Sequence, residues 1–276
     1  MSVAANSATG GVHAAAPLVI DVREGAIATL TMNRPEKLNA LDIGLTEALS
    51  DRVRQVANDS TVRAVVITGA GRGFSAGGDL GVLRDFRERA APKEIERLIR
   101  AGNDAVFTLA TMEKPVIAAV NGPAAGAGMS IALACDIRLA GDSATFAQSF
   151  AKVGLFPDFG STWFLPRLVG VSRAAEMFYS GALITAEEAA DLGIVNRVVP
   201  NDILLDEAKT IAATFAAGPP ISIRAIKKTV LSADAEGLRA ALENEIWQQA
   251  QCFQSEDCAE GFAAFFEKRP PVFRGK

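Results

Sequence analysis

The stretch that decides the fold is KPVIAAVNGPAAGAGMSIALACDIRLA, residues Lys114–Ala140. Its first part, Val116–Val120, is a short apolar run of the kind found in strands that are buried on both faces. The loop Asn121–Ser130 follows, and a helix beginning near Gly126 would leave the N–H of Ala127 free at the positive end of the helix dipole. Small residues leave room for a ligand beside that amide. Close packing of the helix against the strand explains this loop equally well when it is considered alone.

A second strand with a glycine-rich loop precedes this stretch. Arg63–Thr68 (RAVVIT) predicts a buried strand, and RGFSAGGDLGVL follows at Arg72–Leu83. The glycines let the backbone pass close to a ligand, with the amide of Gly78 exposed before Asp79 opens a turn or a helix. Alone, the loop is better explained as a plain turn between strand and helix. A dinucleotide-binding loop is excluded because Phe74 stands where the third glycine of G-x-G-x-x-G belongs.

The two loops are more informative together than apart. Gly78 and Ala127 lie about fifty residues apart, and each follows a predicted strand. Two such loops can each donate one backbone N–H to the same carbonyl oxygen, which makes an oxyanion hole. This arrangement lowers the free energy of an enolate by on the order of several kcal/mol.

Strands and helices alternate up to about Pro200, and only helices are predicted beyond it. This pattern predicts an α/β fold with repeated β-β-α units. We divide the chain into a disordered leader over 1–17, a core over 18–200 and a helical region over 201–276. The elements predicted from periodicity and punctuation are a hairpin of Leu18–Arg23 with Ala26–Met32, helices over Ile43–Asn58 and Glu94–Met112, strands over Asp136–Ala140 and Thr145–Gln148, and C-terminal helices over Ile203–Ala217, Ile221–Ala233, Gly237–Phe253 and Cys258–Arg269.

Composition excludes several kinds of site and partner. The single histidine, His13, lies in the leader, so the folded region offers no imidazole for a Ser-His-Asp triad. The spacing of cysteines and histidine fits no zinc site, and we expect no bound metal. The net charge of −4 argues against a nucleic-acid partner, and no apolar run is long enough to span a membrane. Three cysteines form no disulfide framework, which favours a reducing cytoplasm.

With these motifs, the sequence resembles the crotonase superfamily, also called enoyl-CoA hydratase/isomerase. The motifs occur in order over roughly Leu18 to Phe273, and they are RPEKLNAL (Arg34–Leu41), GFSAGGDL (Gly73–Leu80), the stretch Lys114–Ala140 and EGFAAFFEKRPPVF (Glu260–Phe273). The resemblance implies a crotonase-like spiral of β-β-α units with a C-terminal helical trimerisation region, assembled as a homotrimer or as a hexamer made of two trimers. It also implies an acyl-CoA substrate and no separate cofactor, because coenzyme A is part of the substrate.

The resemblance assigns roles to individual residues. It implies that the amides of Gly78 and Ala127 form the oxyanion hole, and that Phe265 and Lys268 reach the nucleotide end of a neighbouring subunit's site. The residues that it implies along the coenzyme A groove are Lys37, Leu38, Ala76, Asp79 and Leu80. Hydratases of the family use two glutamates to hold a water, and Ser130 and Phe150 stand at those two positions here. A serine without a base beside it cannot replace them, so water addition by the usual mechanism is not expected.

The segment Lys152–Gly170 supplies another carboxylate, Asp158, among apolar residues that would raise its pKa. Taken alone, Asp158 is better explained as the cap of a helix that begins near Gly160 or Ser161. However, PDFGSTWFLPRLVG resembles the corresponding stretch of ring-1,2-epoxyphenylacetyl-CoA isomerases, which implies that Asp158 is the base and then the acid of an isomerisation. The side chains that we assign to an acyl pocket, fit for an aryl group, are Ser130, Phe150, Phe156, Phe159 and Trp163.

Three other functions remain open from the sequence. The first is a hydratase or hydrolase in which Asp158 and Ser130 position water. The second uses Asp158 as a nucleophile on an aryl thioester. The third is a relative that binds thioesters or nucleic acid without catalysis. The interpretation that we favour is an acyl-CoA isomerase that moves a proton or a double bond.

Overall fold

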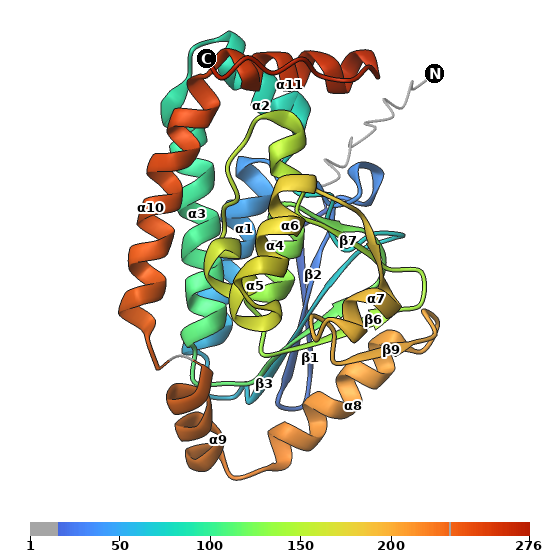
Figure 1. Ribbon diagram of the computed structural model, residues 1–276. Coiled ribbons are helices and arrows are strands. Elements are labelled where there is room, and N and C mark those ends of the chain that lie inside the picture. The colour runs from blue at the N-terminus through green and yellow to red at the C-terminus, as the bar shows by residue number, and fades with distance from the viewer. Residues whose placement is uncertain (1–15, 232) are drawn as a thin grey trace, which may run out of the picture.

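The computed structural model describes residues 16–231 and 233–276 (Figure 1). The leader predicted over 1–17, with His13, lies outside the described residues apart from Ala16 and Pro17. In the described residues, no helix combines the length and the apolarity that crossing a membrane requires.

The larger sheet begins with the predicted hairpin and continues as a parallel sheet. Strands β1 (Val19–Glu24) and β2 (Ile27–Met32) pair antiparallel, with Gly25 in the left-handed region of the turn at φ 60°. The order β1-β2-β3-β4-β6-β9 is parallel from β2 onward. Every residue of β3 and β4 is buried, as expected for parallel strands covered on both faces. The remaining strands of this sheet are β3 (Ala64–Gly69), β4 (Val116–Val120), β6 (Ile137–Gly141) and β9 (Arg197–Val199).

A smaller sheet lies after the ends of these strands and completes each β-β-α turn. It has the order β5-β7-β8, formed by β5 (Ala124–Ala125), β7 (Thr145–Ala147) and β8 (Ile184–Thr185). Two isolated bridges, Ser75 with Ala124 and Leu41 with Gly78, continue the same layer. The glycine loops therefore lie next to each other although they are far apart in the sequence.

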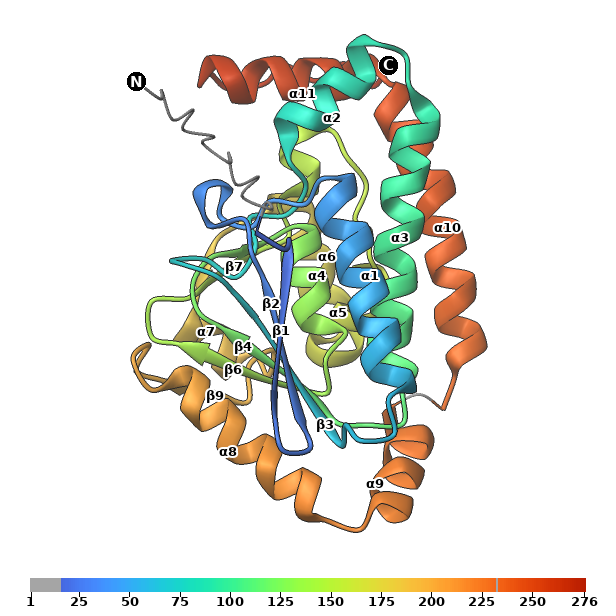
Figure 2. The ribbon, with the colours of Figure 1, turned by 180° about the vertical axis from the view of Figure 1, so that it is seen from behind.

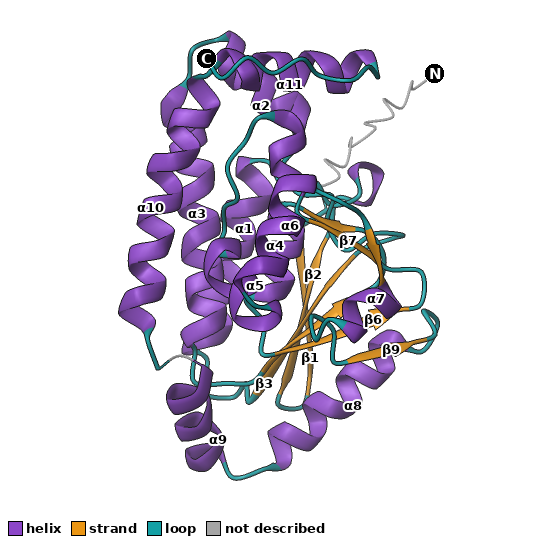
Figure 3. Cartoon of the chain, in the orientation of Figure 1, coloured by secondary structure: helices purple, strands orange, loops and turns teal. Residues whose placement is uncertain are grey.

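Helices cover both faces of the larger sheet. Helix α1 (Ile43–Asn58) has the bounds predicted, because Asp42 caps it by accepting from the N–H of Leu45 at 2.8 Å. It packs against α3 (Pro92–Thr111) on one side of the sheet, and α8 (Leu204–Ala217) crosses the other side (Figures 1 and 2). Figure 3 shows the strands enclosed between these two helical layers. The shorter helices are α2 (Leu80–Glu88), α4 (Ala127–Leu133), α5 (Ser161–Val169), α6 (Val171–Ser180) and α7 (Ala186–Asp191).

The C-terminal helices fold back along the body of the same chain. Helix α10 (Ala235–Gln254) packs against α3, and α11 (Glu256–Glu267) packs against α2 (Figure 1). The helix predicted over Ile221–Ala233 corresponds to two consecutive helical segments. Helix α9 (Pro220–Ile226) is α-helical, and the π-helical turn Lys227–Leu231 follows it directly. The side chain of Lys227 in that turn is buried, and its Nζ lies 2.9 Å from the carboxylate of Asp136.

Candidate functional site

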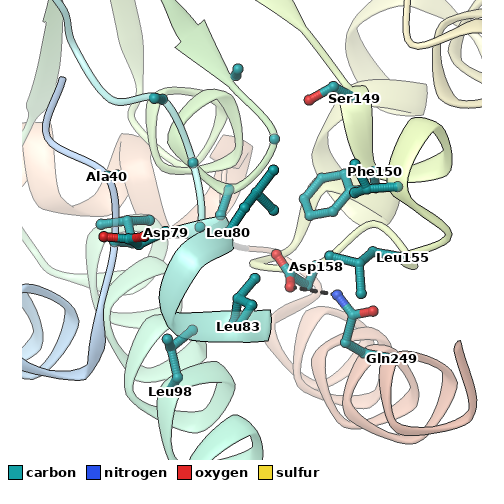
Figure 4. Close-up of a pocket in the computed structure, with 18 of the residues that line it drawn as sticks. Ala40, Asp79, Leu80, Leu83, Leu98, Ser149, Phe150, Leu155, Asp158 and Gln249 are labelled. Carbon is teal, nitrogen blue, oxygen red and sulfur yellow. Dashed lines mark hydrogen bonds between the residues drawn. The ribbon is translucent and has the colours of Figure 1, made fainter. Parts of the chain in front are cut away.

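A cavity of about 520 Å³ lies where the two glycine loops meet the helical layer. The loops contribute Gly77, Gly78 and Ala127, while α3 contributes Ile95, Leu98 and Ile99. Helices α2, α10 and α11 and the 3-10 segment Ser149–Val153 close the remaining sides. In Figure 4 the carboxylate of Asp158 points into this space, with Phe150 and Leu155 on one side and Leu83 on the other.

Gly78 and Ala127, whose amides are expected to hold an oxyanion, both line this cavity, and neither amide has a recorded acceptor among the described residues. The N–H of Leu41 donates to the carbonyl of Gly77 at 2.7 Å, and the N–H of Asp79 donates to the carbonyl of Leu41 at 2.9 Å. In an extended segment neighbouring N–H groups point to opposite sides, so the N–H of Gly78 points away from Leu41. Ala127 is the first residue of α4, where an N–H has no partner within the helix. Among the described residues, the structure records no acceptor for either N–H.

Gly77 allows the two loops to touch at this point. Its φ of +86° lies in the left-handed region, which favours glycine. A Cβ added there would lie 2.6 Å from the carbonyl oxygen of Ala125 and 3.5 Å from the backbone nitrogen of Ala127. A side chain at this position would therefore force the two glycine loops apart.

Asp158 is buried, with 6% of its surface exposed, and it lies in the loop before α5. Its Oδ2 accepts a hydrogen bond from Nε2 of Gln249 at 2.9 Å, whereas Oδ1 has no partner among the described residues. Burial raises the pKa of the Asp158 carboxyl to about 8; the hydrogen bond from Gln249 lowers this pKa, and the negative charge of Glu245 raises it. A carboxyl with a pKa near neutrality can both take up and release a proton under physiological conditions.

The alternative interpretation of Asp158 as a helix cap is wrong. Helix α5 begins at Ser161, and neither Asp158 nor another local side chain caps it. Instead Glu245, on α10, accepts from the N–H of Gly160 at 2.8 Å and from that of Thr162 at 3.2 Å. The carboxylate of Asp158 therefore caps no helix, and it lies at the wall of the cavity.

The buried carboxyl should make the protein less stable as the pH rises. A group whose pKa is raised from 3.8 to about 8 on folding contributes stability that is complete below pH 3.8 and is lost as the pH passes 8. We expect Asp158→Asn to raise the free energy of unfolding by on the order of a few kcal/mol at pH 9. Urea unfolding of the wild type and of Asp158→Asn at pH 5 and pH 9 measures the difference between their free energies of unfolding, with the exposed Asp142→Asn as the control. A difference that does not widen with pH would contradict the raised pKa of Asp158.

Sequence analysis missed both polar residues that hold this loop, Glu245 and Gln249. They come from α10, about ninety residues further along the chain. One signal was available in the sequence. The buried side of α10 is made of Leu238, Leu242, Glu245, Gln249 and Phe253, so two polar residues occupy positions of an otherwise apolar stripe.

Most of the residues assigned to the coenzyme A groove lie along the cavity, but not all of them do. Leu38 and Lys268 are not among its lining residues. Leu38 adopts a left-handed conformation and packs toward Gly73, and Lys268 is the exposed C-cap of α11. The assigned residues that do line the cavity are Lys37, Ala76, Asp79, Leu80 and Phe265.

The contacts of two of these lining residues bear on their assigned roles. Asp79 is already occupied, since its Oδ2 lies 2.8 Å from the guanidinium of Arg34 and its Oδ1 accepts from the N–H of Gly81 at 3.0 Å. Phe265 lines the cavity of its own chain, because α11 packs on α2 of the same subunit. That Phe265 also reaches a neighbouring subunit's site stays a prediction. Phe266, which was not predicted, also lines the cavity and lies beneath the guanidinium of Arg84 at 3.9 Å.

Of the five side chains assigned to an acyl pocket, Phe150 and Phe159 line the cavity. Ser130 is buried beneath the loop and donates to the carbonyl of Gly126 at 3.1 Å. Phe156 and Trp163 also lie outside the cavity lining, and Trp163 packs beneath the guanidinium of Arg167. The cavity is also walled by apolar residues that were not predicted, namely Ile95, Leu98, Ile99, Val153, Leu155 and Phe253.

Comparisons with known proteins agree with this geometry. Residues 22–276 match the family model described as enoyl-CoA hydratase/isomerase. The chain is 41% identical to the 1,2-epoxyphenylacetyl-CoA isomerase of Escherichia coli, over 92% of this chain and 97% of that protein. It is 39% identical to a probable enoyl-CoA hydratase of Rhodobacter capsulatus, over 93% and 97% of the two chains.

A solved structure supports the fold directly. An enoyl-CoA hydratase from Mycobacterium avium subsp. paratuberculosis superposes with a TM-score of 0.83 at 33% identity, and the match covers 93% of this chain and 98% of that one. The spiral of β-β-α units predicted from the sequence is therefore confirmed. The trimerisation assigned to the C-terminal helices stays a prediction.

Proposed function

Because the chain belongs to the enoyl-CoA hydratase/isomerase family, we propose that it is an acyl-CoA isomerase. It moves a proton, and with it a double bond, by way of a thioester enolate held by the amides of Gly78 and Ala127. No separate cofactor takes part, since coenzyme A is a part of the substrate. The acid–base work falls to Asp158.

One observation carries this proposal. Of the two carboxylates that line the cavity in the described part of the chain, only Asp158 has an oxygen without a partner. The other carboxylate, Asp79, is paired with Arg34 and caps α2. A single carboxylate suffices for isomerisation, because it can remove a proton from one carbon and return it to another.

The proposed reaction has two proton transfers. The N–H groups of Gly78 and Ala127 donate to the thioester oxygen, and Asp158 takes a proton from carbon, so that the electron pair of the C–H bond forms the enolate. The protonated Asp158 then gives the same proton to a different carbon, and the enolate collapses to the rearranged thioester. A carboxyl with a pKa of about 8 is stable in both forms during this cycle.

The acyl group that fits best is apolar and aromatic. The cavity is walled by Phe150, Phe159 and Phe253 together with aliphatic side chains of α3. A phenyl ring gains both apolar burial and edge-to-face contacts in such surroundings. The name of the Escherichia coli relative supports an aryl or phenylacetyl-type acyl-CoA as the substrate class.

The coenzyme A moiety would leave the cavity past Lys37 and Lys152, whose side chains line it. Ammonium groups are suitable partners for its phosphates. We retain Leu38 and Lys268 as more distant members of this groove. A homotrimer or a hexamer of two trimers remains the expected assembly.

The second candidate function is hydration, which the name of the Rhodobacter capsulatus relative favours. A nucleophilic water needs two to four polar partners to be held in place. Ser130 is engaged with the carbonyl of Gly126, and the ring of Phe150 faces the cavity, so neither residue holds a water there.

We expect the protein to isomerise cis-3-enoyl or aryl acyl-CoA thioesters and to hydrate crotonyl-CoA very slowly or not at all. Incubation with a panel of these thioesters, followed by mass spectrometry, measures the outcome. A product of unchanged mass and new retention time supports isomerisation. A mass gain of one water identifies a hydratase, and free coenzyme A identifies a hydrolase. Exchange of a ring halide for hydroxyl in a haloaryl thioester identifies a nucleophilic Asp158, and binding of the thioesters without any product identifies a binding protein.

A further inference from the structure

The apolar stripe of α10 is interrupted by Glu245 and Gln249, which lie one turn apart and are 0% and 3% exposed. Buried polar side chains are costly unless they are hydrogen-bonded, so their partners indicate what they do. Both face the loop that carries Asp158. Neither one lies at the oxyanion loops.

Gln249 makes three hydrogen bonds that fix its amide in one orientation. Its Oε1 accepts from the N–H of Phe156 at 2.9 Å, so its Nε2 must face the opposite way. That Nε2 donates to the carbonyl of Phe156 and to Oδ2 of Asp158, each at 2.9 Å. If the side-chain amide were flipped by 180°, Oε1 would face the carbonyl oxygen of Phe156 and Oδ2 of Asp158. All three atoms are hydrogen-bond acceptors, so they would repel one another.

We propose that Gln249 is a positioning residue for proton transfer, which holds Oδ2 of Asp158 so that Oδ1 alone is presented to the substrate. The inference rests on the proposed function in one respect, namely that Asp158 is the base. Gln249 itself need not touch the substrate's reacting carbons. Its effect passes through the carboxylate that it orients.

The hydrogen bond also acts on the protonation of Asp158. A donor to Oδ2 stabilises the carboxylate, so Gln249 opposes the rise in the pKa of Asp158 that burial causes. Glu245 acts in the other direction, because its charge raises the pKa of Asp158. The other charged residues that line the cavity are Asp79 after the first glycine loop, Lys37 of the 3-10 turn Pro35–Lys37, and Lys152 before the Asp158 loop. The walls from α3 and α11 are apolar.

These opposite effects allow a test with two substitutions on one helix. Gln249→Met keeps the length of the side chain and removes the donor. Glu245→Gln removes the charge and keeps one of the two acceptor oxygens, so either Gly160 or Thr162 retains its hydrogen bond. Gln251→Met places the same new side chain at an exposed position of α10 and serves as the matched control.

The measurement is the pH profile of kcat/KM together with the titration of Asp158 by NMR in protein with labelled aspartate carboxyls. For Gln249→Met we expect the acid limb to move up by about one pH unit, with a loss of activity of about tenfold below it. For Glu245→Gln we expect the limb to move down, and for Gln251→Met we expect no change. A structural role alone would lower activity at every pH without moving the limb.

The outcomes separate this inference from the proposed function. If Asp158→Asn is inactive but Gln249→Met has the profile and the carboxyl titration of the wild type, Gln249 does not position the base, and the isomerase proposal survives. If Asp158→Asn is active, the proposed function fails, while the NMR titration still decides whether Gln249 acts on Asp158. Should Gln249→Met not fold, as judged by circular dichroism, Gln249→Leu replaces it. That variant also removes the donor without adding a charge, and it must raise the same titration midpoint.

Discussion

Replacing Asp158 by asparagine is expected to lower turnover by about three orders of magnitude while acyl-CoA binding persists. Asparagine has the shape of the carboxyl, and its Oδ1 can still accept from Nε2 of Gln249. It cannot take up a proton. The substitution therefore removes the chemical step and leaves the cavity as it is. Single-turnover assays measure the rate, and calorimetric titration with the substrate thioester measures binding.

The wild-type pH profile provides an internal check on this prediction. Because the base must be deprotonated, kcat/KM should rise with pH and level off above a pKa of about 8. Asp142→Asn, on the exposed turn after β6, should leave both the rate and the profile unchanged. Full activity of Asp158→Asn would mean that another group transfers the proton.

The parts of this site that could be predicted from the sequence are those encoded within one stretch of chain. The strand before each glycine loop, the N–H of Ala127 at the start of α4 and the bounds of α1 all follow from local patterns. The bridges between Leu41 and Gly78 and between Ser75 and Ala124 bring the loops together. They could be inferred only because parallel strands place their carboxyl ends at one edge of a sheet.

The parts that could not be predicted depend on contacts between distant segments. Phe159 has a positive φ of 54°, and its ring packs on Gly102 of α3, where an added Cβ would lie 1.9 Å from the ring. Nothing in either local sequence pairs these two residues. The same holds for Gln249 and Asp158, which meet because α10 packs along α3 beside the loop. Local periodicity predicts which face of a helix is buried, but not which loop lies against it.

Removing the amide hydrogen of Ala127 is the second substitution expected to have a large effect. Ala127→Pro deletes one oxyanion donor, and turnover should fall by about a hundredfold to a thousandfold. Proline is tolerated at the first position of a helix, because the N–H there has no partner within the helix. The preceding residue is Gly126, which lacks the Cβ that normally clashes with a following proline ring. Helix α4 should therefore persist.

The control for this substitution is Ala235→Pro, which places proline at the first residue of α10, away from the cavity lining. It should retain full activity, while thermal melts verify that both variants remain folded. The loss in Ala127→Pro should appear in kcat more than in KM, since the hydrogen bond strengthens as negative charge develops on the thioester oxygen. An equal loss in the two alanine-to-proline variants would show that proline perturbs the fold. Unchanged turnover in Ala127→Pro would show that the enolate is held by other donors.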